Sequence, residues 1–96
     1  MNDGDVMNDN EVDAIVRDLV ERDLVSLVLD VCQRRGVPLR ELCGRSHRLS
    51  VSRARQEVWA RLRGDPQRFY SFPDIARIFR RDHTTVLAGV RAHAQR

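Results

Sequence analysis

The residues best suited to chemistry in this chain form one short string, Arg81-Asp82-His83-Thr84-Thr85-Val86-Leu87. Aspartate is a preferred N-cap, so Asp82 is predicted to accept hydrogen bonds from the free backbone N–H groups at the start of a helix. His83, Thr84 and Thr85 would then project from the exposed N-terminal end of that helix. Threonine can meet a base edge with its hydroxyl and methyl groups, and a carboxylate can accept from the cytosine amino group. The string therefore predicts contact with nucleic acid bases.

A second polar group lies upstream, where Gly44-Arg45-Ser46-His47-Arg48-Leu49-Ser50 has the composition of a basic loop. The segment Arg53-Ala54-Arg55-Gln56 follows it. Charge is divided along the chain: residues 1–30 carry a net charge of −7, and residues 31–96 carry +10. All 17 basic residues are arginine, whose planar fork binds phosphate with two hydrogen bonds. The second part of the chain is therefore expected to attract a polyanion.

Helical patterns provide the elements that would position these groups. Residues 1–10 lack periodicity and are predicted to be a disordered acidic tail. Residues 11–23 are predicted to form an acidic amphipathic helical arm, with an apolar stripe made of Val12, Ile15, Val16, Leu19 and Val20. Charged residues interrupt the stripe at 21–23, so the helix either continues through this point or restarts with Asp23 as its cap.

Residues 24–96 are predicted to form one small all-α domain. A helix with Leu24, Leu27, Val28 and Val31 on one face should stop at Gly36, and Pro38 suits the first turn of a short helix. A longer helix is expected over residues 51–62. Ser71-Phe72-Pro73-Asp74 resembles a capping box, and Arg80 and Arg81 should form the turn before the last helix. Two short helices joined by a tight turn are typical of a helix-turn-helix.

Together, the string from Arg81 to Leu87 and the segment Arg53-Ala54-Arg55-Gln56 resemble the C-terminal DNA-binding domain of DnaA, the bacterial chromosomal replication initiator. The resemblance covers residues 24–96. It implies sequence-specific binding to double-stranded DNA at DnaA-box-like sites, with the recognition helix in the major groove and the basic loop in the minor groove.

The resemblance also implies roles for individual residues. Major-groove contacts are expected from Asp82, His83, Thr84, Pro73 and Arg63. One of Arg48, His47 and Arg45 is expected to enter the minor groove, and we favour Arg48. Contacts to the DNA backbone are expected from Arg53, Arg55, Gln56, Arg81 and Thr85.

The chain departs from the family pattern in three ways. Many members have one or two glycines before the Arg-Asp pair, where this chain has Phe79-Arg80, and glycine there is typical of a turn with a positive φ. The connection before Ser71 is about two residues longer. A glycine-rich phosphate loop is missing from the sequence, so we expect no nucleotide and no ATPase activity.

Other classes of function are less well supported. Cys32 and Cys43 are predicted to be small core residues, and Cys43 with His47 does not complete a four-ligand metal site. The sequence has no apolar run of the ~18 residues that a membrane span needs, and its acidic start differs from a signal peptide. We therefore expect a cytoplasmic, nucleoid-associated protein without cofactor, metal or membrane contact.

The leading hypothesis is a regulator of replication initiation or transcription that binds duplex DNA. The alternative is an adaptor whose acidic N-terminal helix binds a protein partner while the basic domain tethers it to DNA, although the same apolar stripe could pack on its own domain. An enzyme is disfavoured because Asp82 and His83 are sequence neighbours on a helix and point in different directions. The sequence also offers no accompanying nucleophile or metal set.

Overall fold

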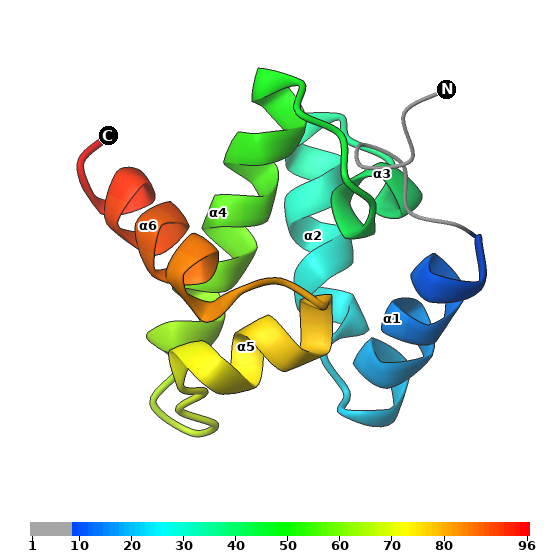
Figure 1. Ribbon diagram of the computed structural model, residues 1–96, viewed down its shortest axis with the longest axis horizontal. Coiled ribbons are helices and arrows are strands. Elements are labelled where there is room, and N and C mark those ends of the chain that lie inside the picture. Colours follow the sequence, from blue (N-terminus) through cyan, green and yellow to red (C-terminus); the bar gives the residue numbers. More distant parts are fainter. Residues whose placement is uncertain (1–8) are drawn as a thin grey trace.

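The computed structural model describes residues 9–96, which form six helices and no strand (Figure 1). The helices are α1 (Asp9–Glu21), α2 (Val25–Arg35), α3 (Leu39–Cys43), α4 (Leu49–Arg63), α5 (Phe72–Phe79) and α6 (His83–Ala94). The predicted all-α fold class is confirmed. The predicted tail, residues 1–10, lies largely outside the described residues, but Asp9 and Asn10 belong to α1, which begins two residues earlier than expected.

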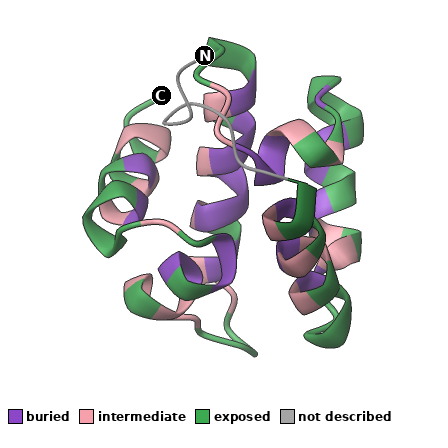
Figure 2. Cartoon of the chain, turned by 45° about the vertical axis from the view of Figure 1, so that its right-hand side comes forward, coloured by how far each residue is buried: buried purple, intermediate pink, exposed green. Residues whose placement is uncertain are grey.

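The longest helix, α4, is the centre of the arrangement. It contacts α2, α3, α5 and α6, and α1 packs against α2, α3 and α5 (Figure 1). The buried residues lie on the sides of the helices that face one another (Figure 2), and they form one apolar cluster. Its fully buried large members include Leu24, Leu42, Leu62, Ile75 and Phe79. Cys32 and Cys43 belong to the same cluster, as the sequence predicted.

The apolar stripe of α1 packs on the domain itself. Val12, Ile15 and Leu19 are each less than 5% exposed, whereas Val20 is 57% exposed. On the polar side, Arg40 of α3 pairs with Asp13 at 2.8 Å and with Asp9 at 3.1 Å. The stripe is therefore already used within the domain, and a partner that docks on α1 would have to use its exposed face.

The helix is interrupted between α1 and α2, and Asp23 does not cap the second helix. Asp23 has a φ of 59°, and Leu24 holds the N-cap position without a side-chain hydrogen bond. The backbone N–H of Leu24 donates to the carbonyl of Leu19 at 2.8 Å. This left-handed turn places charged Asp23 in solvent and buries Leu24 completely, so burial of a leucine, rather than capping, determines where the helices separate.

The ends of the next helices differ from the expectations by a few residues. Gly36 is left-handed with a φ of 66° and ends α2, as predicted. Pro38 holds the N-cap of α3 rather than its first turn. Helix α4 begins at Leu49, so the part of the basic loop outside the helices is residues 44–48.

Local capping defines the helix-turn-helix formed by α5 and α6. Ser71 and Asp74 make the predicted capping box, with Asp74 N–H donating to Ser71 Oγ at 3.1 Å. The turn contains Arg80 in the left-handed region, at φ 56° and ψ 47°. Asp82 then caps α6, as predicted, by accepting from the backbone N–H of Thr84 at 3.0 Å. These contacts determine the direction in which α6 leaves the turn.

The apolar faces of α4 and α5 are buried, whereas in α6 Val86 and Gly89 are the buried residues and Ala94 is exposed. Phe69 is 67% exposed. Among the described residues, the helices are all too short or too polar to cross a membrane.

Candidate nucleic-acid interface

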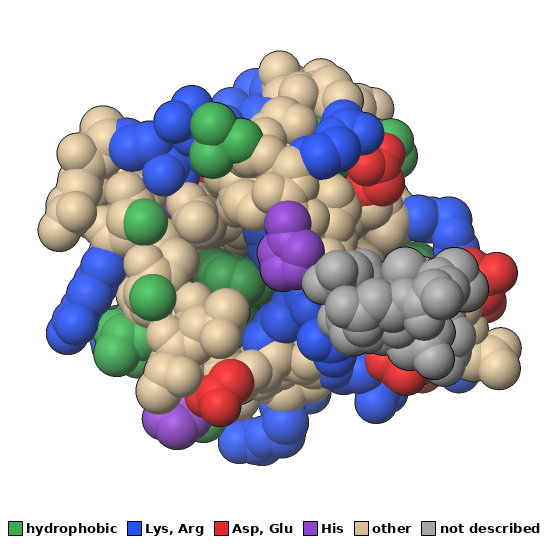
Figure 3. Space-filling model, turned by 45° about the horizontal axis from the view of Figure 1, so that its top comes forward, with side chains coloured by type: hydrophobic (Ala, Val, Ile, Leu, Met, Phe, Trp, Pro, Cys, Tyr) green, Lys and Arg blue, Asp and Glu red, His purple; other side chains and the backbone are tan. Residues whose placement is uncertain are grey.

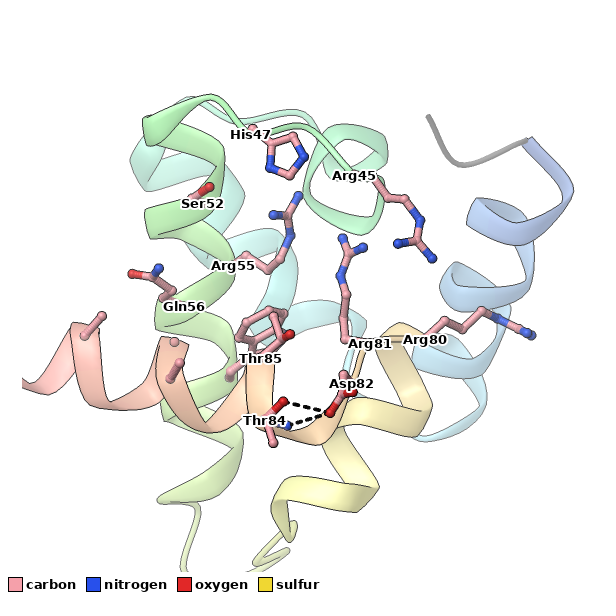
Figure 4. Close-up of a pocket in the computed structure, with 14 residues that line it drawn as sticks. Arg45, His47, Ser52, Arg55, Gln56, Arg80, Arg81, Asp82, Thr84 and Thr85 are labelled. Carbon is pink, nitrogen blue, oxygen red and sulfur yellow. Dashed lines mark hydrogen bonds between the residues drawn. The ribbon is translucent and has the colours of Figure 1, made fainter. Parts of the chain in front are cut away.

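A hollow of about 830 Å³ separates the N-terminal half of α6 from the loop at residues 44–48. Figure 3 shows arginine side chains within a hollow on this side of the molecule, and Figure 4 shows the residues that line it. The hollow brings together predicted residues from three parts of the sequence: Arg45, His47, Arg55, Gln56, Arg81, Asp82, Thr84 and Thr85.

Asp82 and Thr84 form the polar start of α6. Oδ1 of Asp82 accepts from both the backbone N–H and the hydroxyl of Thr84, at 3.0 and 2.9 Å (Figure 4). These two hydrogen bonds lower the pKa of the Asp82 carboxyl. Within residues 9–96, Oδ2 accepts no hydrogen bond and can accept from a base amino group. Because the Thr84 hydroxyl already donates to Asp82, it meets a ligand as an acceptor.

Pro73 and His83 meet at a second, smaller hollow of about 580 Å³ between the starts of α5 and α6. Both side chains are exposed. His83 Nδ1 lies 3.6 Å from Oδ1 of Asp82. The two predicted major-groove residues therefore lie on one continuous surface with Asp82, which lines both hollows.

The three candidates for the minor groove are placed differently from one another. Arg45 and His47 line the larger hollow. Arg48, which the sequence favoured, lines neither hollow and pairs with Glu41 of α3 at 3.2 Å. The geometry thus brings Arg45 and His47, rather than Arg48, next to the N-terminal half of α6.

Arg55 is buried under the basic loop, with only 7% of its surface exposed. Its guanidinium donates to the backbone carbonyls of Leu42 at 2.9 Å, Gly44 at 3.1 Å, Glu41 at 3.2 Å and Ser46 at 3.3 Å. Burial lowers the pKa of Arg55. In this structure the donors of Arg55 hold the loop and the end of α3, and its contact with the DNA backbone stays a prediction.

Arg81 joins Arg55 at the same carbonyl. Its guanidinium also donates to the oxygen of Gly44, and Figure 4 shows it directed from the turn toward the basic loop. Burial, together with the nearby charges of Arg55 and Arg45, lowers the pKa of Arg81 to about 10. In the described part of the chain, neither Arg55 nor Arg81 has a carboxylate within ion-pair distance. Their positive charge is therefore not neutralised within the domain.

The remaining predicted contacts lie around the hollows. Gln56 lines the larger hollow and accepts from Arg96 at 2.6 Å. Arg53 is exposed on α4 outside both hollows. Arg63 also lies outside them, with its guanidinium carbon 4.9 Å from the ring centre of Phe72 and 5.3 Å from that of Phe69. The stack holds Arg63 close to the start of α5.

Sequence reasoning missed Arg80 and Trp59. Arg80 was predicted only as part of the turn, yet it lines both hollows. The sequence signal for Arg80 was its positive charge directly before the string from Arg81 to Leu87. Trp59 lines the larger hollow and packs under Gly89 of α6. The sequence carried no signal for the glycine that lies against Trp59.

The described residues contain no group of three or more His, Cys, Asp or Glu side chains placed to hold a metal ion. Both cysteines are buried and free. Burial raises the pKa of the Cys43 thiol to about 12, so this residue is a protonated thiol at neutral pH.

One family of known proteins matches the chain. The model of the bacterial DnaA protein helix-turn-helix matches residues 26–92, more than half of the sequence and all of α3, α4 and α5. No curated protein and no solved structure shows a significant match.

Proposed function

Because the chain belongs to the family of the bacterial DnaA protein helix-turn-helix, we propose that it binds a specific duplex DNA site and regulates replication initiation or transcription. Family membership supports double-stranded DNA as the partner. The proposal adds the site-specific reading and the regulatory role, with a DnaA-box-like sequence as the expected target.

The observation that carries the proposal is the spacing of two reading elements across one arginine-lined hollow. In B-form DNA the major and minor grooves are neighbours, separated by a single phosphate backbone. The start of α6 and the loop at residues 44–48 flank the hollow of about 830 Å³. If α6 enters the major groove and the loop enters the next minor groove, the backbone strand between the grooves lies in this hollow.

The charge of the hollow suits a phosphate backbone. Its lining includes four arginines, Arg45, Arg55, Arg80 and Arg81, and one acid, Asp82. The start of α6 adds backbone N–H groups and the positive end of the helix dipole. Because Arg55 and Arg81 lack a carboxylate partner in residues 9–96, an incoming phosphate would meet cations that no internal acid neutralises.

Base reading is assigned to the exposed surface at the start of α6. Asp82 offers Oδ2 as an acceptor, Thr84 offers a hydroxyl acceptor and a methyl group, and His83 is 63% exposed beside them. Pro73 presents an apolar ring at the same surface, suited to a thymine methyl group. Each well-placed base contact contributes about 1–3 kcal/mol of discrimination.

Selection of bound sequences from a random duplex pool tests the proposal most directly. An enriched motif is expected, and its affinity should fall with salt at a slope near −4 to −5 in a log–log plot, for roughly four to six neutralised phosphates. Recovery of no motif, together with equal affinity for all duplexes, would reject site-specific reading. A flat salt response would reject the backbone contact in the hollow.

Reading of the minor groove is tested separately with modified duplexes. Replacing a G·C pair by inosine·C removes only the guanine amino group that projects into the minor groove. Affinity should change at the base pairs that face the loop and stay constant at those that face α6. Among Arg45→Ala, His47→Ala and Arg48→Ala, the variant that abolishes this sensitivity identifies the side chain in the groove. If the wild-type protein is insensitive at every position, the loop does not read the minor groove.

A further inference from the structure

Arg80 has a backbone conformation that is unfavourable for an arginine. It ends α5 in the left-handed region, at φ 56° and ψ 47°, with its N–H donating to the carbonyl of Ala76. A side chain with a Cβ atom is strained in this region, whereas glycine adopts it freely. A turn that only needed to join α5 to α6 would therefore be more stable with glycine, so the arginine side chain is expected to have a use.

The side chain of Arg80 has no partner within residues 9–96. Three arginines lie near this turn, and the other two are engaged: Arg77 pairs with Asp74 at 3.5 Å, and Arg81 donates to the carbonyl of Gly44. Arg80 is exposed and makes no ion pair or side-chain hydrogen bond in that part of the chain. Its guanidinium is thus available to an external ligand.

The position of Arg80 indicates which ligand this is. Arg80 lines both the hollow beside the basic loop and the hollow beside Pro73. Figure 4 shows its side chain extending from the turn on the far side of Arg81 from Gln56. Basic and polar groups therefore run from Gln56 of α4 across Arg55 and Arg81 to Arg80. In the proposed complex, the backbone strand between the two grooves would run along this row.

We propose that Arg80 is a further DNA ligand, whose guanidinium binds a phosphodiester of the strand that crosses the larger hollow. The inference rests on the proposed function and adds a contact beyond the residues predicted from the sequence. The chemistry is that of an arginine fork on a phosphate, with charge-assisted hydrogen bonds. The left-handed conformation is then strain retained at a binding site.

Two substitutions separate the charge of Arg80 from its backbone strain. R80Q removes the charge and keeps the strain, so DNA affinity should fall about fivefold at low salt, and the salt slope should become shallower by about one unit. R80G removes both, so it should lose the same affinity while its Tm is equal to or above that of the wild type. R80K keeps a positive charge and should retain most of the salt slope.

Matched controls come from α1 and the α1–α2 turn. R17Q removes one exposed arginine that lines neither hollow, and it should leave the salt slope unchanged. D23G relieves a second left-handed residue, at φ 59°, and should raise or maintain the Tm without reducing DNA affinity. R17Q shows whether a loss of affinity in the Arg80 variants reflects the position of Arg80 or only the net charge of the protein. D23G shows whether it reflects the relief of backbone strain.

The outcomes distinguish this inference from the proposed function. If wild-type protein binds duplex DNA and R80Q binds with the same affinity and slope, Arg80 is not a ligand and the proposed function stands. If R80Q and R17Q lose affinity equally, only net charge matters and the inference fails. If the wild-type protein binds no duplex at low salt, the proposed function itself is wrong.

Discussion

Arg55 and Arg81 donate hydrogen bonds to one acceptor, the backbone carbonyl oxygen of Gly44. Arg55 comes from the middle of α4, and Arg81 comes from the turn that leads into α6. Through this shared carbonyl, the basic loop is tied to the central helix and to the start of the recognition helix at once. The two elements proposed to read neighbouring grooves are therefore held in a fixed relative position before DNA arrives, which lowers the entropic cost of binding.

We predict that Arg55→Met destabilises the fold. Methionine replaces the aliphatic part of the buried side chain but removes its hydrogen bonds to four carbonyl oxygens, of which Gly44 keeps Arg81 as a donor and Glu41 keeps the Gly44 N–H. The free energy of unfolding should therefore fall by about 3 kcal/mol. Amide hydrogens of residues 45–47 should also exchange faster, because the loop loses its anchor. Urea denaturation and hydrogen exchange measure these two effects.

Arg53→Met is the matched control for this prediction. Arg53 is exposed on the same helix, so its replacement should change stability by no more than about 0.5 kcal/mol. The burial argument fails if Arg55→Met is as stable as Arg53→Met and nevertheless loses DNA affinity. That result would favour Arg55 as a phosphate ligand.

We also predict that His83→Ala and Arg53→Ala impair DNA binding in different ways. His83 lies on the base-reading surface, so its loss should cost about 1–3 kcal/mol on the preferred site and little on random duplex. Arg53 is predicted to contact the backbone, so its loss should weaken all sequences alike and reduce the salt slope by about one unit. Titration of both variants against specific and random duplexes measures these two effects. The prediction is wrong if each variant loses affinity for the specific and the random duplex by the same factor.

The helix-turn-helix could be predicted from the sequence because its signals are local. Ser71 and Asp74 are three residues apart, and Asp82 precedes Thr84 by two, so a short stretch of chain contains each cap with its partner. Ile75, Ile78 and Phe79 are likewise spaced three and four residues apart, the pattern of one helical face, and all three are buried. Such features depend on backbone geometry within one or two turns, which neighbouring residues determine.

The role of Arg55 could not be predicted because it depends on contacts between distant segments. An arginine followed by glutamine on an amphipathic helix has the pattern of an exposed basic face. Only the packing of α3 and the loop over α4 reveals that the carbonyls of Leu42 and Gly44 surround its guanidinium. The turn at Asp23 is similar, since burial of Leu24 against other helices decides it. Periodicity along one segment carries no information of this kind.

The free energy of unfolding should fall at acidic pH, partly because the Glu57 carboxylate becomes protonated. Burial alone would raise the pKa of this carboxyl, but hydrogen bonds from Arg34 and Arg35 outweigh burial and hold the pKa below its usual value. A lowered pKa in the folded state stabilises the fold above the pKa of the unfolded chain, about 4.3. That contribution disappears as the pH falls through the folded value.

Glu57→Gln tests this prediction. The variant should be about 1–3 kcal/mol less stable than the wild type at pH 7, where the wild-type carboxylate is ionised. The difference should shrink as the pH falls below about 4, since protonation removes the same charge from the wild type. Urea denaturation across this pH range measures the difference. A gap that stays constant from pH 7 to pH 3 would show that Glu57 does not contribute through its charge.

The last prediction concerns the contact between α4 and the recognition helix. A Cβ atom at Gly89 would lie 2.8 Å from Cε3 and Cζ3 of Trp59, and this indole is held edge-on against Phe79 at a centroid distance of 6.3 Å. Because the ring cannot move aside without disturbing the core, Gly89→Ala should push α6 away from α4. We expect a loss of about 1–3 kcal/mol in the free energy of unfolding.

Trp59 is the single tryptophan, so its fluorescence reports the same change directly. In Gly89→Ala the emission should shift to longer wavelength as water reaches the indole, and specific DNA affinity should fall more than affinity for random duplex, because the start of α6 is displaced from the basic loop. Gly64→Ala is the matched control, since its new Cβ would meet nothing closer than the Ala60 carbonyl at 3.4 Å and its φ is −92°. That variant should keep the wild-type spectrum and DNA preference. If Gly89→Ala also keeps both, the close approach of α6 to Trp59 does not position the recognition helix.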